Sequence, residues 1–138
     1  MRALLLVLLA SPALAAGTPD PAPSLAQAEA AIAREDYAAA IPLLREVAAV
    51  EPGNADALNL LGFASRRTGA LEEAATAYEA ALALDPEHLG ALEYQGELFV
   101  LQGEMALAEA NLAKLAELCG ACEEHAALAE AITSGEGW

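Results

Sequence analysis

The chain has 138 residues, of which 57% are hydrophobic and only 4% aromatic, and its formal net charge at pH 7 is −15. A chain this acidic repels nucleic acids and anionic membrane surfaces, which argues against binding to either. The charge is consistent with solubility of an exported protein, or with a preference for basic partners. The scarcity of aromatic residues argues against a stacking platform for bases or sugars.

The first segment, residues 1–15, has the pattern of a secretory signal peptide. Arg2 precedes a short apolar run, and small residues stand at Ala13 and Ala15. The run is shorter than the roughly 20 apolar residues of a membrane-spanning helix. We therefore expect cleavage after Ala15, a periplasmic or secreted protein, and no stable membrane insertion after cleavage; an uncleaved anchor is the alternative.

From residue 16 onwards, the sequence predicts a short leader followed by helices. Residues 16–23 are rich in proline, which predicts an extended leader. Glycine and proline breakers then divide the chain into helical segments, because glycine favours a helix end and the residue before proline avoids helical geometry. We expect helices over about 24–34, 37–50, 55–68, 71–84, 89–102, 105–118 and 123–133.

These helical segments repeat at an interval of 34 residues. Equivalent positions hold similar residues in three sets: Ala40, Ala74 and Ala108; Leu44, Tyr78 and Leu112; Val50, Leu84 and Leu118. Gly62 and Gly96 also correspond, and these small residues allow the two helices of a pair to approach closely. Such an interval is typical of stacked helical hairpins, each of which buries its apolar side only against its neighbours. The units are expected at about 21–54, 55–88 and 89–122.

The second unit resembles the tetratricopeptide repeat family over its full length, from Ala55 to His88. The packing residues that it shares with the family are Gly62, Gly69, Leu71, Ala74, Tyr78, Ala81, Leu84 and Pro86. The first unit departs from the pattern, because Ala28 and Glu35 replace its two glycines. The resemblance implies an all-α, right-handed α-solenoid of three helical hairpins. We expect the helix over 123–133 to cap its open end, with a loose tail over 134–138.

The resemblance also implies a non-catalytic protein–protein interaction module, in which the first helix of each unit lines a groove for a peptide or protein. The matching positions are Asn59, Phe63, Arg66, Arg67, Glu93, Glu97 and Val100. Arg66 and Arg67 stand out because the chain has only six basic residues and arginine can grip a carboxylate through two hydrogen bonds. Basic residues near a helix end also complement its dipole without any ligand. The family's usual carboxylate-gripping set is not reproduced, because Leu60 stands where asparagine is common.

The two cysteines, Cys119 and Cys122, are the one chemically distinctive pair. In an exported protein their most direct interpretation is a structural disulfide that pins the bend before the last helix. A redox-active dithiol is an alternative, although Glu123 and Glu124 oppose the negative charge of a thiolate. A metal site that adds Glu124 and His125 to the two sulfurs is another alternative.

No catalytic arrangement is apparent in the sequence. Its two histidines have no serine or cysteine partner at a recognisable spacing, and there is no glycine-rich phosphate loop. We therefore predict that the chain is not an enzyme, needs no cofactor or metal, and acts as an exported adaptor or assembly factor that binds a peptide or protein on its concave face. The alternative is a redox- or metal-linked accessory protein acting through Cys119 and Cys122.

Overall fold

The computed structural model describes residues 22–137, and within this range the chain forms seven α-helices and no strand. The predicted signal peptide, residues 16–21 of the predicted leader and Trp138 lie outside the described residues. The helices are α1 (Leu25–Ala33), α2 (Tyr37–Val50), α3 (Ala55–Arg67), α4 (Leu71–Leu84), α5 (Leu89–Leu101), α6 (Met105–Cys119) and α7 (Glu123–Ser134). Each helix begins and ends within one residue of the range expected from the sequence.

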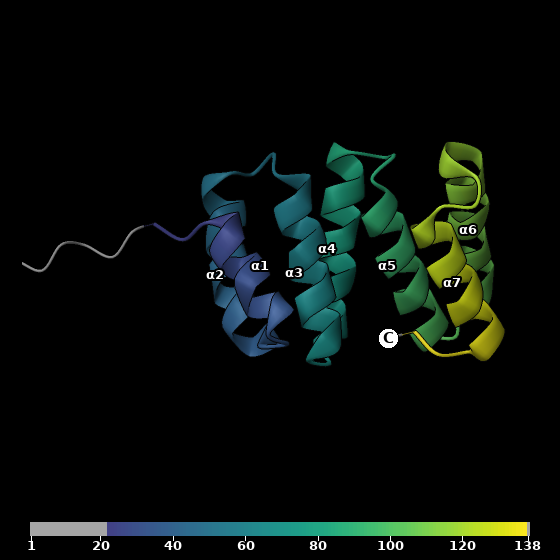
Figure 1. Ribbon diagram of the computed structural model, residues 1–138, viewed down its shortest axis with the longest axis horizontal. Helices are drawn as coiled ribbons and strands as arrows, with labels where there is room; N and C mark the ends of the chain where they lie inside the picture. The colour runs from purple at the N-terminus through teal and green to yellow at the C-terminus, as the bar shows by residue number, and fades with distance from the viewer. Residues whose placement is uncertain (1–21, 138) are drawn as a thin grey trace, which may run out of the picture.

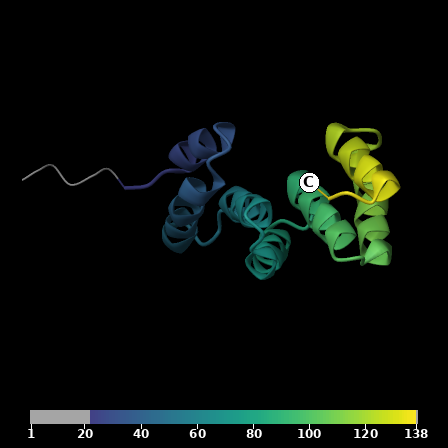
Figure 2. The same cartoon turned by 90° about the horizontal axis from the view of Figure 1, so that it is seen from below.

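The helices form an array that runs from α1 and α2 at one end to α6 and α7 at the other (Figure 1). Figure 2 shows that the array is curved and has two layers, with α1, α3, α5 and α7 on the inner side and α2, α4 and α6 on the outer side. Successive inner helices contact each other, α1 with α3, α3 with α5 and α5 with α7. This is the all-α solenoid of three hairpins that the sequence predicts, with α7 added as a last inner helix. We call the inner side the concave face.

Side chains at the helix starts explain where the first three helices begin. Ser24 accepts a hydrogen bond from the backbone N–H of Gln27, and the Gln27 side chain accepts one from the Ser24 N–H, which is a capping box. Asp36 and Asn54 accept a backbone N–H at the starts of α2 and α3. Each such cap stabilises the helix start by about 1 kcal/mol.

The turn inside each hairpin requires a left-handed backbone conformation at one residue. Gly69 and Gly103 adopt it in the second and third units, with φ of 84° and 77°. In the first unit the same place is held by Glu35, whose φ is 58°. A residue with a Cβ atom is strained in this region, so the first turn is less favourable than the two glycine turns.

Two equivalent glycines allow close helix packing, but against different partners. A Cβ atom on Gly62 would collide with the fully buried ring of Tyr78 in α4, the second helix of the same hairpin. A Cβ atom on Gly96 would instead collide with Leu128 of α7. The prediction that Gly96 makes room for the second helix of its own hairpin is therefore wrong. The reason is that α7 covers the side of α5 on which Gly96 lies.

The last helix, α7, packs against both α5 and α6. Leu128 is fully buried there and clusters with Leu92 and Leu115. Beyond α7 the chain turns back, and Gly137 lies against the backbone carbonyl of Glu97. The described part of the predicted tail therefore rests on α5. None of the helices between residues 22 and 137 is long and apolar enough to cross a membrane.

Candidate functional site

The seven residues predicted for the groove all lie on α3 and α5, the two central inner helices. They differ in how accessible they are. Asn59, Arg66, Glu97 and Val100 are buried, Phe63 and Glu93 are partly buried, and Arg67 is exposed. A ligand on the concave face would therefore meet Arg67, Phe63 and Glu93 before the others.

Around Phe63 the structure gathers an aromatic cluster, which we define as Tyr37, Phe63, Tyr78 and Tyr94. The Phe63 ring meets Tyr37 edge-on with centroids 5.7 Å apart, and it lies 4.9 Å from the Tyr94 ring. Tyr78 extends the cluster to α4, 6.5 Å from Tyr94. Aromatic pairs at such distances attract each other beyond their burial alone. Tyr37 and Tyr94 are not among the residues predicted for the groove, although Tyr94 precedes Glu97 by three residues and so shares its face of α5.

The two arginines at the end of α3 have different environments. The Arg67 guanidinium lies 4.9 Å from the centre of the Tyr37 ring and 5.9 Å from that of Phe63. Such cation–π contacts hold an exposed cation in place while its N–H groups stay available. The Arg67 side chain is therefore a positioned donor for an acidic ligand group.

Arg66, in contrast, is used inside the protein. Its side chain is 1% exposed, and its Nη2 atom lies 2.6 Å from Oε2 of Glu97, whose side chain is 11% exposed. The pair is an ion pair by distance, whereas no guanidinium N–H of Arg66 is aligned for a hydrogen bond to another described residue. The rings of Phe63 and Tyr94 lie 5.8 Å from its guanidinium carbon. Arg66 therefore joins α3 to α5 and does not reach outwards.

The other half of the concave face is dominated by carboxylates. Burial, together with the negative charges of Glu97 and of Glu124 on α7, raises the pKa of Glu93 to about 8. Burial also raises the pKa of Glu97, and Arg66 opposes part of that rise. Burial is the largest cause of both shifts, so these two carboxyl groups keep their protons to a higher pH than an exposed glutamate does.

A hollow of about 300 Å³ opens next to these carboxylates, between α5, α7 and the chain that follows α7. Its lining residues are Glu97, Ala127, Glu130, Ala131, Ser134 and Glu136. Half of these lining residues are glutamates, and the other half are the small residues alanine and serine. By charge and size, this hollow can accept a basic side chain.

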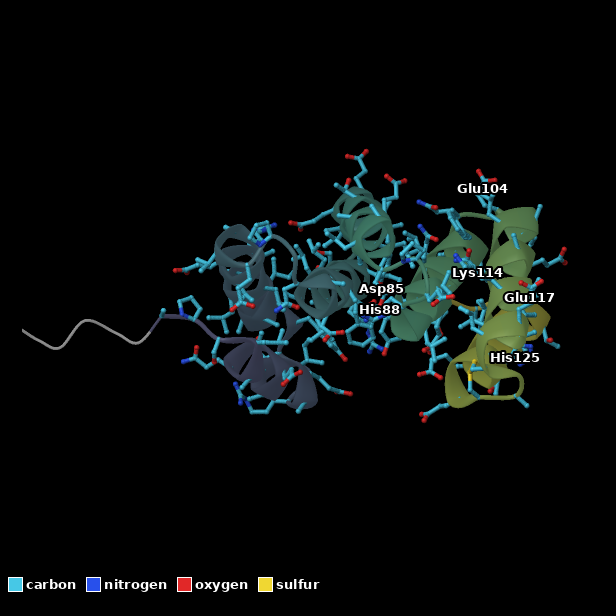
Figure 3. All side chains as sticks on the ribbon, turned by 90° about the horizontal axis from the view of Figure 1, so that it is seen from above. Asp85, His88, Glu104, Lys114, Glu117 and His125 are labelled. Carbon is cyan, nitrogen blue, oxygen red and sulfur yellow. A yellow bond between two sulfur atoms is a disulfide. The ribbon has the colours of Figure 1, made fainter. Side chains whose placement is uncertain are left out.

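His88, which lies between α4 and α5, has a structural role. Its Nδ1 atom accepts a hydrogen bond from the backbone N–H of Ala91, so the ring caps α5. Its Nε2 atom therefore carries the proton and donates it to Oδ1 of Asp56, 2.9 Å away. Figure 3 shows His88 near Asp85 at the turn that joins the second and third units. Both ring nitrogens are thus engaged in holding two units together.

Cys119 and Cys122 form a disulfide at the junction of α6 and α7, with Cα atoms 5.6 Å apart. Cys119 is the last residue of α6, and Cys122 immediately precedes α7. A carboxylate oxygen of Glu124 and the two sulfur atoms all lie within 4.8 Å of one another. Figure 3 shows the sulfur atoms and the labelled His125 at the same end of the molecule, but the His125 ring is not part of this group of three.

Comparisons with known proteins agree with this helical architecture. Residues 25–88 and 66–121 match the family described as "Tetratricopeptide repeat". The chain belongs to the tetratricopeptide repeat family. A solved structure described as "MamA RS-1 ArsTM double mutant" is similar to 67% of this chain, with 29% sequence identity and a TM-score of 0.64. This chain spans about half of that structure's length, 52%. No curated protein matches this chain.

The family and the curved two-layer array together make this tetratricopeptide repeat protein a protein–protein interaction module. Its inner helices offer an exposed arginine and aromatic rings in the second unit and carboxylates in the third. The chemistry of the surface therefore changes along the array.

Proposed function

We propose that this protein is a non-catalytic, exported adaptor or assembly factor that binds a peptide or protein segment on its concave face. The observation that carries the proposal is the exposed Arg67, stacked on Tyr37 beside the partly buried Phe63. An arginine fixed in this way has already lost much of the side-chain freedom that binding would otherwise remove. It is suited to bind a carboxylate of the partner.

The carboxylate half of the same face adds a second requirement on the partner. The hollow beside Glu97 and Glu130 suits a lysine or arginine side chain, because three of its six lining residues are glutamates and the others are small. The partner segment therefore carries an acidic group facing α3 and a basic residue facing the space between α5 and α7. The acidity of the whole chain favours basic over acidic partners in the first encounter.

Binding is tested with a peptide array probed by the chain from residue 16 onwards, followed by fluorescence anisotropy on the peptides that bind. Arg67→Ala should weaken binding about tenfold or more, equivalent to about 1.4 kcal/mol. The matched control is Arg45→Ala, which removes the same charge from the outer helix α2 and should change affinity little.

Equal losses for Arg67→Ala and Arg45→Ala would show that only net charge matters, and the concave face would be excluded as the site. Export is tested separately by the mass of the protein recovered outside the cytoplasm. A chain that begins at Ala16 supports it, and an intact Met1 contradicts it.

A further inference from the structure

The junction of α6 and α7 brings together three groups that bind metal ions in proteins. They are the sulfur atoms of Cys119 and Cys122 and a carboxylate oxygen of Glu124, all within 4.8 Å of one another and all partly buried. The end of α6 supplies the first group, and the start of α7 supplies the other two. The backbone therefore fixes the three groups from two helices that already pack together.

Two cysteines separated by two residues are a common half of a tetrahedral zinc site, and a carboxylate is an accepted third ligand. With Cα atoms 5.6 Å apart, both sulfurs can reach one ion with Zn–S bonds of about 2.3 Å. The disulfide form cannot do this, because the bonded sulfurs are not thiolates. Any metal would therefore bind only after reduction.

The charges around the junction favour a cation over a free thiolate. Glu123 and Glu124 lie in the first turn of α7, immediately after Cys122. This negative surrounding disfavours a second anion on sulfur unless a cation accompanies it. The same surrounding attracts a divalent ion, which distinguishes a metal site from a redox-catalytic dithiol.

We propose that reduction of the Cys119–Cys122 disulfide creates a Zn²⁺ site formed by the two thiolates and Glu124, with water in the fourth position. A dithiol reductant supplies two electrons and two protons, which cleave the S–S bond into two thiols while the reductant becomes a disulfide. Zinc then binds both sulfurs, and the two thiol protons pass to solvent. This inference is independent of the proposed peptide binding.

The consequence is that the start of α7 stays attached to the end of α6 in both redox states. Cys119 packs beside Leu115 and Leu128, so the junction is continuous with the core that holds α7 on α5. In oxidising surroundings the covalent bond closes this junction. In reducing surroundings with zinc present, the metal closes it.

The test uses the full chain, oxidised or reduced with a phosphine and freed of oxygen, and titrated with Zn²⁺ against a chromophoric chelator. The reduced chain should bind one Zn²⁺, and the oxidised chain none. Co²⁺ in place of Zn²⁺ should give the near-ultraviolet absorption of cobalt–thiolate bonds. Absence of zinc binding by the reduced chain, or equal binding by the oxidised chain, would overturn the proposal.

Single substitutions identify the ligands. Glu124→Gln should weaken zinc binding about tenfold and Cys122→Ser should abolish it, whereas Glu123→Gln, which changes the neighbouring carboxylate, is the matched control and should have less than a twofold effect. Circular dichroism verifies that each variant is folded. If Glu124→Gln and Glu123→Gln bind zinc equally well, Glu124 is not a ligand and the three-ligand site is refuted, even if the cysteines are required.

Discussion

The first helices of the second and third units, α3 and α5, place equivalent residues on the concave face, and the two sets differ in chemistry. At the 34-residue interval, Asn59, Phe63, Arg66 and Arg67 of α3 correspond to Glu93, Glu97, Val100 and Leu101 of α5. An aromatic ring in one unit is thus replaced by a carboxylate in the next, and two cations are replaced by apolar side chains.

What repeats is the packing that builds the array, and what varies is the surface that the array presents. Gly62 and Gly96 are both packed too closely to carry a side chain, and Ala74 and Ala108 are both fully buried. Substitution at such positions disturbs the helix contacts, whereas exposed inner positions are free to change. The Arg66–Glu97 ion pair connects the two surfaces, because it joins the cationic end of α3 to the acidic face of α5.

Removal of that ion pair should have the largest effect on stability. Arg66→Ala leaves the buried carboxylate of Glu97 without its cation, and we expect the free energy of unfolding to fall by about 3 kcal/mol, measured by urea denaturation. The double variant Arg66→Met with Glu97→Gln should recover much of the loss, because no buried charge then remains unpaired. Arg45→Ala, at an exposed pair with Glu73, should cost much less. A loss no greater than that of the Arg45 variant would show that the two faces are not coupled.

Glu93 on α5 should make the free energy of unfolding depend on pH, by an amount smaller than the loss expected for Arg66→Ala. Its folded-state pKa of about 8 lies above the ordinary value of 4.5, so between these values the folded chain holds a proton that the unfolded chain has released. The contribution of Glu93 to the free energy of unfolding therefore falls as pH rises from about 4.5 to 8. Glu93→Gln should be more stable than the unchanged protein at pH 8 and above, by about 1–2 kcal/mol because solvent screens part of the interaction.

Thermal unfolding of both proteins from pH 5 to pH 9 measures this difference. Glu79→Gln, on the exposed side of the outer helix α4, is the control and should run parallel to the unchanged protein. A Glu93→Gln curve that also ran parallel would mean that the α5 carboxyl is ordinarily charged in the folded state.

The smallest effect concerns the first unit, which departs from the other two at its turn. Glu35→Gly should stabilise the protein by about 0.5–1 kcal/mol, because glycine relieves the left-handed strain that Gly69 and Gly103 avoid in the equivalent turns. Chemical denaturation measures the gain. Glu35→Ala removes the same charge but keeps the strain, so it should give little gain; equal gains from both would assign the effect to charge.

The helix boundaries could be predicted because local signals coincide with a fixed interval. Glycine favours a helix end, and proline keeps the residue before it out of helical geometry. These breakers recur at the 34-residue interval, as Gly69 and Gly103 and as Pro52 and Pro86. The family pattern then set the layer in which each helix lies. For this reason, no observed helix end differs from the expected one by more than one residue.

The candidate site could be predicted only as far as which positions lie on the inner helices. Whether Arg66 points outwards or inwards depends on Glu97, which stands 31 residues later and belongs to another unit. The contact of Arg67 with Tyr37 likewise joins α3 to the start of α2. Periodicity says nothing about such contacts between units, since they depend on side chains that do not repeat. The partner of Gly96 was missed for the same reason, because Leu128 lies outside the repeated hairpins.

All three tyrosines of the chain, Tyr37, Tyr78 and Tyr94, belong to the aromatic cluster. The tyrosine bands of the circular dichroism spectrum therefore report on one place, where α2, α3, α4 and α5 meet. A bound segment that draws the Arg67 guanidinium away from the Tyr37 ring would alter those bands without any added label. Fraying of α6 and α7, which carry no tyrosine, would leave those bands unchanged, so the protein carries its own optical probe of this part of its concave face.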